Sequence, residues 1–432
     1  MVFNTGFLAF VQGLEIFSLK TRRDDDYCDR LSHHHTALFL LITSVLISSN
    51  QYVGSPIHCW VPKEFSGVWQ KYANNYCWIK NTYIVPPNQK DGLIPKPSER
   101  PELEINYYQW VPIVLLCQAL LFYFPSIVWR MLNWTLGINI QDLINKAMNV
   151  CTTIRPDVQK PKPNDENDAS KETKVPIQED IEPEVPQEIK DMAYHLELSI
   201  QSESNSKGSF AKTVRSLLFC GFGSRKYGFY LITLYIFTKL LYIINVVGQL
   251  FLLNSFIGTS YKLFGFQMLF NLAKGNDWKN TGHFPRITLC DFEIRNLGQR
   301  TNYTVQCVLP INLFNEKIYI FIWFWIFIVA ILSVYSLFSW LLRMIASQRF
   351  KFIQGLLEKR LKNWSTTDNN QLKRFIDEHL KTDGVFLIYL IYLNAGDLVT
   401  KELLDVMWYR YKKLSETKMS LDSNYPEEAQ FL

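Results

Sequence analysis

The segment Gly275–Lys317 reads GNDWKNTGHFPRITLCDFEIRNLGQRTNYTVQCVLPINLFNEK. It is polar, aromatic and rich in turn-forming residues, it contains Cys290 and Cys307, and it lies between two long apolar runs. A segment that joins two membrane spans and carries paired cysteines is most simply an extracellular loop that disulfides hold in place. We therefore expect a second polar loop with two cysteines elsewhere in the chain.

That second loop is present, and it contains Cys59 and Cys77. Two such loops indicate a channel or receptor of the plasma membrane rather than an enzyme. Four extracellular cysteines allow three pairings, and their spacing does not choose among them. A zinc site is the competing interpretation, but no C-x-x-C spacing occurs, so disulfides are favoured. The other cysteines are assigned to the cytoplasmic side (Cys28, Cys151 and Cys220) or to the second span (Cys117).

Apolar residues are unevenly distributed along the 432 residues of the chain. The mean hydropathy of −0.03 is typical of a soluble protein, but an average hides clustering. Four apolar runs predict membrane helices, although a buried helix in a soluble core is the alternative for any single run. The net charge of +5 gives no argument for nucleic-acid binding. The runs are Thr36–Asn50 with its flanking residues, Tyr107–Trp129, Tyr227–Leu253 and Ile318–Leu342.

The orientation in the membrane follows from the termini and from the basic residues. The first residues have no basic region and no small-residue cleavage site, so we predict no cleavable signal peptide. Four spans then place both termini on one side. Basic residues precede the third span and follow the fourth, which predicts that these ends and both termini are cytoplasmic. These residues are Arg215, Arg225, Lys226, Arg343, Arg349, Lys351, Lys359, Arg360 and Lys362.

Two features near the amino terminus have open interpretations. Residues Met1–Lys20 repeat aromatic and apolar residues at helical spacing, which predicts a short amphipathic helix that lies on the membrane surface or folds into a pore mouth. The cluster His33–His35 begins the first span. It is either a polar helix end or a pH switch, whereas a metal site is disfavoured because neighbouring helical residues do not share a face.

The third span carries a polar stripe made of Lys239, Tyr242, Asn245 and Gln249, which recur on nearly one helical face. A buried ammonium is costly, so this face is predicted to point toward other helices or water rather than lipid. A role in gating or permeation is one interpretation. A structural hydrogen-bonding stripe between helices is the other.

The polar segments differ in composition. Residues 156–188 are rich in Pro, Lys, Glu and Asp without aromatics, which predicts a disordered part of a cytoplasmic loop. The tail from Phe352 to Leu414 has a helical pattern, and its apolar stretch Phe386–Leu393 requires a packing partner. In the second outer loop, Asn302 begins the sequence Asn-Tyr-Thr, an acceptor for N-glycosylation.

Motifs along nearly the whole chain resemble those of one family. They are YYQWV (Tyr107–Val111), PIHCW (Pro56–Trp60), GNDW (Gly275–Trp278), CDF (Cys290–Phe292), KLLYIIN (Lys239–Asn245) and DGVF (Asp383–Phe386). Together they resemble the innexins, the invertebrate gap-junction proteins, which are related to the pannexins. The resemblance is weakest over 156–188, and Ser55 stands where the family often has an acidic residue.

The resemblance implies a channel built from eight subunits, and two such hemichannels can dock across the gap between cells. It implies the nested disulfides Cys59–Cys307 and Cys77–Cys290. It also implies that the amino-terminal helix lines the cytoplasmic pore funnel, in place of lying on the membrane surface. The pore-lining residues would then be Met1, Val2, Phe3, Asn4 and Thr5.

We therefore predict an all-α membrane protein with four transmembrane helices, disulfide-linked extracellular loops and a helical cytoplasmic domain. The function is that of a channel subunit for ions and small solutes, without enzymatic chemistry, cofactor or metal. Docked junctions and free hemichannels stay open alternatives, and a four-span adhesion or scaffold protein is the rival. Expected partners are copies of the chain, other innexins and lipids. The expected parts are the pore helix and linker 1–30, spans 31–52, 107–132, 227–253 and 317–345, outer loops 53–106 and 254–316, cytoplasmic loop 133–226 and tail 346–432.

Overall fold

The computed structural model describes residues 23–80, 82–84, 100–134, 139–159, 185–202, 228–257, 265–266, 270, 284–296, 298–358 and 366–424. The expected pore-lining residues Met1–Thr5, the motif Gly275–Trp278 and most of the acidic segment 156–188 lie outside these ranges. The chain forms two compact units, which are described separately below. The helical unit comprises the described parts of 1–30, 126–240 and 336–432, and the sheet unit those of 31–125 and 241–335.

Within the described residues, four helices are long and apolar enough to cross a membrane, which agrees with the predicted number of spans. Pro310 begins the last of them, as proline at the first helical position removes no hydrogen bond that the helix needs. Pro125 is tolerated inside the second, which continues on both sides of it. The first span, Tyr27–Tyr52, consists of α2 (Tyr27–Arg30), the π-helix η1 (Leu31–Thr36) and α3 (Ala37–Tyr52), and the others are α5 (Val111–Trp134), α9 (Tyr230–Ile257) and α11 (Pro310–Arg343).

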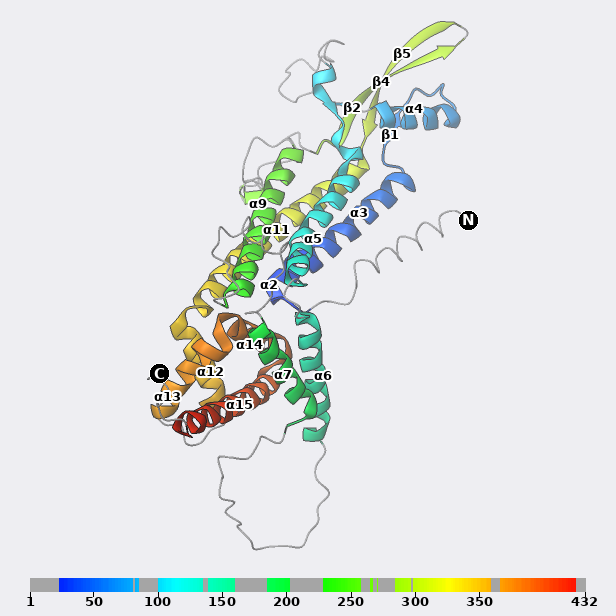
Figure 1. Cartoon of the computed structure of the whole chain (residues 1–432). Helices are drawn as coiled ribbons and strands as arrows, with labels where there is room; N and C mark the ends of the chain where they lie inside the picture. Colours follow the sequence, from blue (N-terminus) through cyan, green and yellow to red (C-terminus); the bar gives the residue numbers. More distant parts are fainter. Residues whose placement is uncertain are drawn as a thin grey trace. The chain divides into compact units, whose positions relative to one another are not determined.

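The sheet unit contains an antiparallel sheet that was not predicted from the sequence (Figure 1). Its strand order is β1-β5-β4-β2-β3, so strands of the first loop flank a hairpin from the second. Gly298 lies in the hairpin turn with φ +86°, a conformation that other residues rarely adopt. The strands are β1 (His58–Trp60), β2 (Thr82–Tyr83), β3 (Glu104–Ile105), β4 (Ile287–Asn296) and β5 (Gln299–Val308).

β1, β2 and β3 have two or three residues and give no alternating pattern of their own. The ten-residue β5 does alternate, with Tyr303, Val305 and Cys307 on its inner face, and this signal for the hairpin was missed. The sheet packs against α4 (Gly67–Lys80) through the fully buried Ala73 and Cys77. Phe65 lies edge-on to Tyr303 at 5.2 Å, and Tyr303 stacks on Phe292 at 5.6 Å between ring centres. The outer loops therefore have a hydrophobic core of their own.

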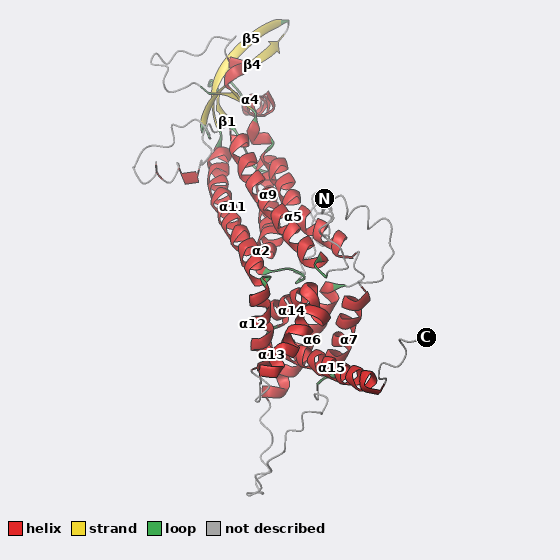
Figure 2. Cartoon of the chain, turned by 60° about the vertical axis from the view of Figure 1, so that its left-hand side comes forward, coloured by secondary structure: helices red, strands yellow, loops and turns green. Residues whose placement is uncertain are grey.

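The helical unit is a bundle whose core includes α14 (Figure 2). α14 is buried without interruption from Thr382 to Ile391. Tyr392 and Leu393, the end of the predicted stretch Phe386–Leu393, are exposed, whereas Phe386–Ile391 has the packing partners that the sequence required. These partners come from helices on both sides of the acidic segment. The helices of the bundle include α6 (Ile140–Gln159), α7 (Gln187–Ser202), α12 (Ala346–Glu358), α13 (Thr366–Arg374), the π-helix η6 (Phe375–Leu380), α14 (Lys381–Ala395) and α15 (Asp397–Asn424).

Asp383 of the DGVF motif connects this bundle to the third span within the helical unit. Its carboxylate accepts a hydrogen bond from the N–H of Ile232 at 3.1 Å, and its own N–H donates to the carbonyl of Gly228 at 3.0 Å. Ile232 lies in the first turn of α9, where N–H groups lack partners within the helix. Asp383 therefore caps α9 from a distant part of the chain.

Candidate functional sites: the outer sheet and a buried lysine cluster

Two disulfides join the outer loops. Cys59 is bonded to Cys307, and Cys77 is bonded to Cys290, which are the pairs that the resemblance implied. Cys59 and Cys307 are directly opposite each other in the β1–β5 register, with Cα atoms 3.9 Å apart. The second disulfide attaches α4 to β4. Each bond therefore crosses from the first loop to the second, and all four cysteines are buried.

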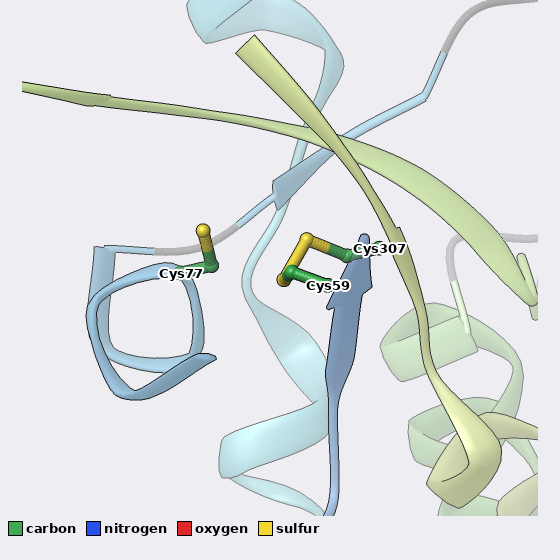
Figure 3. Close-up of side chains that lie close together, drawn as sticks. All are labelled: Cys59, Cys77 and Cys307. Carbon is green, nitrogen blue, oxygen red and sulfur yellow. A yellow bond between two sulfur atoms is a disulfide. The ribbon is translucent and has the colours of Figure 1, made fainter. Parts of the chain in front are cut away.

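The sulfur atoms of Cys59, Cys77 and Cys307 lie within 4.8 Å of one another (Figure 3). Such a cluster has the composition of a zinc site. Here each of the three sulfurs belongs to a disulfide, so none is the thiolate that a metal requires. The proximity is explained by the packing of two disulfides side by side.

Asp291, next to Cys290, holds four parts of the outer region together. Its carboxylate pairs with Arg100 at 2.6 Å and accepts hydrogen bonds from Thr304 Oγ1 at 2.7 Å and from the Tyr83 hydroxyl at 3.2 Å. Burial and the Asp291 charge raise the pKa of Tyr83 to about 12, so its hydroxyl stays a donor at neutral pH. Asp291 thus links β4 and β5 to β2 and to the turn η2 (Arg100–Leu103).

The YYQWV motif ties the start of the second span to the outer sheet and the first span. The carbonyl of Tyr108 accepts a hydrogen bond from Gln51 Nε2 at 2.7 Å, and Gln109 donates to the carbonyl of Trp78 in α4. Tyr108 is fully buried, whereas Trp110 is exposed, as expected of an aromatic residue at a membrane surface. The motif fixes how the outer sheet continues into these two spans.

Asn302 lies exposed on β5, opposite Glu293 of β4. Glu293 forms ion pairs with Arg295 and Arg300, so polar and charged side chains surround the asparagine. The position is accessible to a glycan.

Lys239 is 1% exposed and lies within a group of polar side chains of the helical unit. Its Nζ donates to Asp26 Oδ2 at 2.6 Å and to Asp29 Oδ2 at 2.8 Å. Trp340 Nε1 and Ser336 Oγ also donate to Asp26, at 2.8 and 2.6 Å. The Tyr235 hydroxyl donates to Asp29 at 3.0 Å. We call Lys239, Asp26, Asp29, Tyr235, Ser336 and Trp340 the lysine cluster.

The lysine cluster lowers the pKa of Asp26, the residue directly before the first span. Burial raises the pKa of Asp26, but the nearby Lys239 charge and several hydrogen bonds outweigh it and lower the pKa from 3.8 to about 2. For Asp25, by contrast, burial and the Asp24 charge raise the pKa. Arg30 anchors the same segment to α14 by donating to Asn394 Oδ1 at 2.9 Å.

Asp26 and Asp29 were not predicted as the partners of Lys239. The available signal was the coincidence of several aspartates just before one span with a single lysine inside another, since a buried lysine requires a nearby carboxylate. Because more than 200 residues separate them, spacing could not suggest the pairing.

The remaining polar-stripe residues lie in the sheet unit. Tyr242 is buried and faces the ring of His33 at 6.2 Å, and His33, itself buried in η1, also contacts Tyr123. Further along the stripe, Gln249 Nε2 donates to Asn245 Oδ1 at 3.4 Å. These contacts fit the structural interpretation of the stripe, namely hydrogen bonds and ring contacts between and within helices.

The architecture defines a class: a multi-pass membrane protein whose two outer loops form one disulfide-linked sheet and whose chain also builds a separate helical bundle. The innexin family model matches residues 25–411. Innexin unc-9 of Caenorhabditis elegans is 38% identical over 403 residues, covering 93% of this chain and 96% of that protein. Innexin-11 of C. elegans is 34% identical (91% and 80% covered), and innexin-19 of Caenorhabditis briggsae is 33% identical (92% and 89% covered).

The chain therefore belongs to the innexin family. Innexins are subunits of gap-junction channels, so this protein is a multi-pass gap-junction channel subunit that works in oligomers and is not an enzyme. The adhesion or scaffold alternative is not favoured. The predicted fold class is also confirmed, with the outer sheet as an addition to it.

Proposed function

We propose that eight copies of the chain form a hemichannel that passes ions and small solutes, and that it docks with a hemichannel of an adjacent cell. Both termini are cytoplasmic, and the disulfide-linked loops face the gap between the cells. Membership of the innexin family supports the oligomeric channel. The basic residues Arg343, Arg349 and Lys351 after the fourth span support the orientation.

The observation that carries the docking proposal is the construction of the outer sheet. Strands of the first loop flank the hairpin of the second, two buried disulfides cross between the loops, and Asp291 adds polar links. Cross-links restrict the alternative conformations of loops that would otherwise be flexible. A preorganised surface of this kind loses little conformational entropy when it docks.

Paired whole-cell recording from coupling-deficient cells that express this chain alone tests the proposal, together with single-cell recording. Junctional current is expected, because identical outer sheets face each other. Single-cell current without junctional current would contradict docking and leave the hemichannel. Absence of both currents, with the protein detected at the cell surface, would contradict a homomeric channel and require other innexins as partners.

For the pore, we propose that Met1, Val2, Phe3, Asn4 and Thr5 line the cytoplasmic entrance. The lysine cluster supports this proposal because it anchors Asp26, which directly precedes the first span, and Asp29 in the first turn of that span. A charged thiol reagent in the recording pipette should reduce the current of an Asn4→Cys channel. A Glu416→Cys channel, altered on an exposed part of α15, is the control. Equal sensitivity of both channels would contradict the assignment.

The free hemichannel has a specific observation in its favour, the exposure of Asn302 on the β4–β5 hairpin. A bulky hydrophilic glycan there would hinder docking of the outer sheets. Glycosidase treatment should shift the protein on a gel, and Asn302→Gln should abolish the shift. This substitution is preferable to Thr304→Ala, because Thr304 donates to Asp291. Asn133→Gln, at a second acceptor sequence, is the matched control, and no shift in the wild type would refute the idea.

A further inference from the structure

A pocket of about 410 Å³ lies in the helical unit between α12 and the end of α13 with η6. It starts where the fourth span stops, since α11 ends at Arg343 and α12 begins at Ala346. Its lining combines two lysines, other polar side chains, a single carboxylate and an aromatic ring. These residues are Ser347, Phe350, Lys351, Gln354, Lys373 and Asp377.

The charge of the pocket favours an anion. Lys351 and Lys373 are both exposed, and both line the pocket. Among the described residues that line the pocket, Asp377 is the one acidic side chain. The two ammonium groups come from different helices, α12 and α13, so a ligand between them would contact both.

The end of α11, which directly precedes the pocket residues of α12 in the chain, exposes apolar side chains. Phe338, Leu342 and Ile345 are 59%, 60% and 51% exposed on and just after the last turns of α11. In a membrane span, exposed apolar side chains of this kind face lipid tails. Along the chain, residues that would contact acyl tails therefore come first, and the basic pocket follows. A phospholipid has the same arrangement, with its tails next to its charged headgroup.

We propose that this pocket binds the phosphorylated headgroup of an anionic phospholipid whose tails lie along the end of α11. Lys351 and Lys373 neutralise the headgroup phosphate, and Phe350 packs against its apolar part. A soluble phosphate ion would use the lysines and leave the apolar surface uncovered. The lipid would belong to the cytoplasmic leaflet, which rests on the orientation given under the proposed function.

The test counts bound lipids on the purified full chain by native mass spectrometry, with dioctanoyl phosphatidylinositol bisphosphate as the probe. Phosphatidylcholine of the same chain length, which has no net headgroup charge, measures the binding that does not depend on an anionic headgroup. Lys351→Gln/Lys373→Gln should weaken binding roughly 30-fold, at about 1 kcal/mol for each basic residue. Asp377→Asn removes the negative charge and should strengthen binding several-fold.

The matched control is Lys146→Gln/Lys401→Gln, which removes two lysines of the same unit that pair with aspartates four residues earlier. It should bind like the wild type. Equal loss in both double variants, or no loss in either, would overturn the site. Competition by inorganic phosphate or free inositol trisphosphate at the concentration of the lipid would overturn the lipid assignment and indicate a soluble anion.

Failure of this proposal and failure of the proposed channel are distinguishable. The binding assay uses solubilised protein, so it depends neither on docking nor on orientation. Protease accessibility of the tail in intact cells tests the orientation separately. An external tail would refute the cytoplasmic orientation while the lysine-dependent lipid binding remained measurable.

Discussion

Replacing Lys239 with methionine removes the ammonium that two buried carboxylates share. In the wild type, Nζ lies 2.6 Å from Asp26 Oδ2 and 2.8 Å from Asp29 Oδ2. Methionine has a similar length, so the change removes charge with little loss of volume. The two carboxylates are then buried near each other without their common cation.

The expected cost is about 3 to 5 kcal/mol, the range for breaking a buried ion pair by removing one partner. This corresponds to a loss of roughly two to nearly four orders of magnitude in the folding equilibrium constant. Adding Asp26→Asn and Asp29→Asn to Lys239→Met removes the uncompensated charges and should recover more than half of the loss. Ser336, Tyr235 and Trp340 can still donate to the amide oxygens.

The assay is denaturant unfolding of the solubilised protein, followed by tryptophan fluorescence, which includes Trp340 of the cluster. Lys146→Met is the control, because Lys146 pairs with Asp142 on an exposed helix surface and such pairs contribute about 0.3 to 0.5 kcal/mol. If Lys239→Met destabilises no more than this control, or if the triple variant is less stable than the single one, the reasoning about the cluster is refuted.

Three further predictions concern other parts of the chain. Cys59→Ser or Cys290→Ser should abolish junctional current, because each removes one disulfide of the outer sheet. Cys151→Ser, at a free cysteine, should preserve the current. Junctional current retained in Cys59→Ser or Cys290→Ser would contradict the role of the disulfides. Asp383→Ala should destabilise the helical unit by about 1 to 2 kcal/mol through loss of the α9 cap, and Asp383→Asn by less, as measured by thermal unfolding. The folded state lowers the pKa of Asp26 to about 2, so the ionised Asp26 carboxylate contributes its full stabilisation of the fold at any pH above its unfolded pKa. This contribution to the free energy of unfolding is lost as the pH falls through about 2. Unfolding measured as a function of pH should show the loss in the wild type and not in Asp26→Asn.

The four spans could be predicted because a long apolar run has few alternatives to a membrane helix. The assignment of the four outer cysteines to two loops could also be predicted, because these cysteines lie between the apolar runs that form the spans. The apolar stretch Phe386–Leu393 was also recognisable, since an apolar helix in a polar tail needs a partner, and its residues are buried as far as Ile391.

The sheet and the lysine cluster depend on contacts between distant segments. β1, β2 and β3 have three residues or fewer, and hydrogen bonds to β4 and β5 hold β1 and β2 in place rather than intrinsic strand propensity. The partners of Lys239 are determined by how helices pack, and a charge alone does not identify which carboxylate will neutralise it. The capping of α9 by Asp383 was likewise invisible, because a cap usually comes from the residue that precedes the helix.

The strand order β1-β5-β4-β2-β3 also constrains when the outer sheet can form during synthesis. β1 has its partner in β5, which ends at Val308, so the first loop must wait for the second before its sheet hydrogen bonds exist. In the orientation proposed above, the two loops meet only after the third span has crossed the bilayer and the second loop has been translocated. Until then Cys59 and Cys77 lack their partners, so in the proposed orientation a nascent chain that stalls before Cys290 exposes both thiols to the oxidising machinery of the secretory pathway.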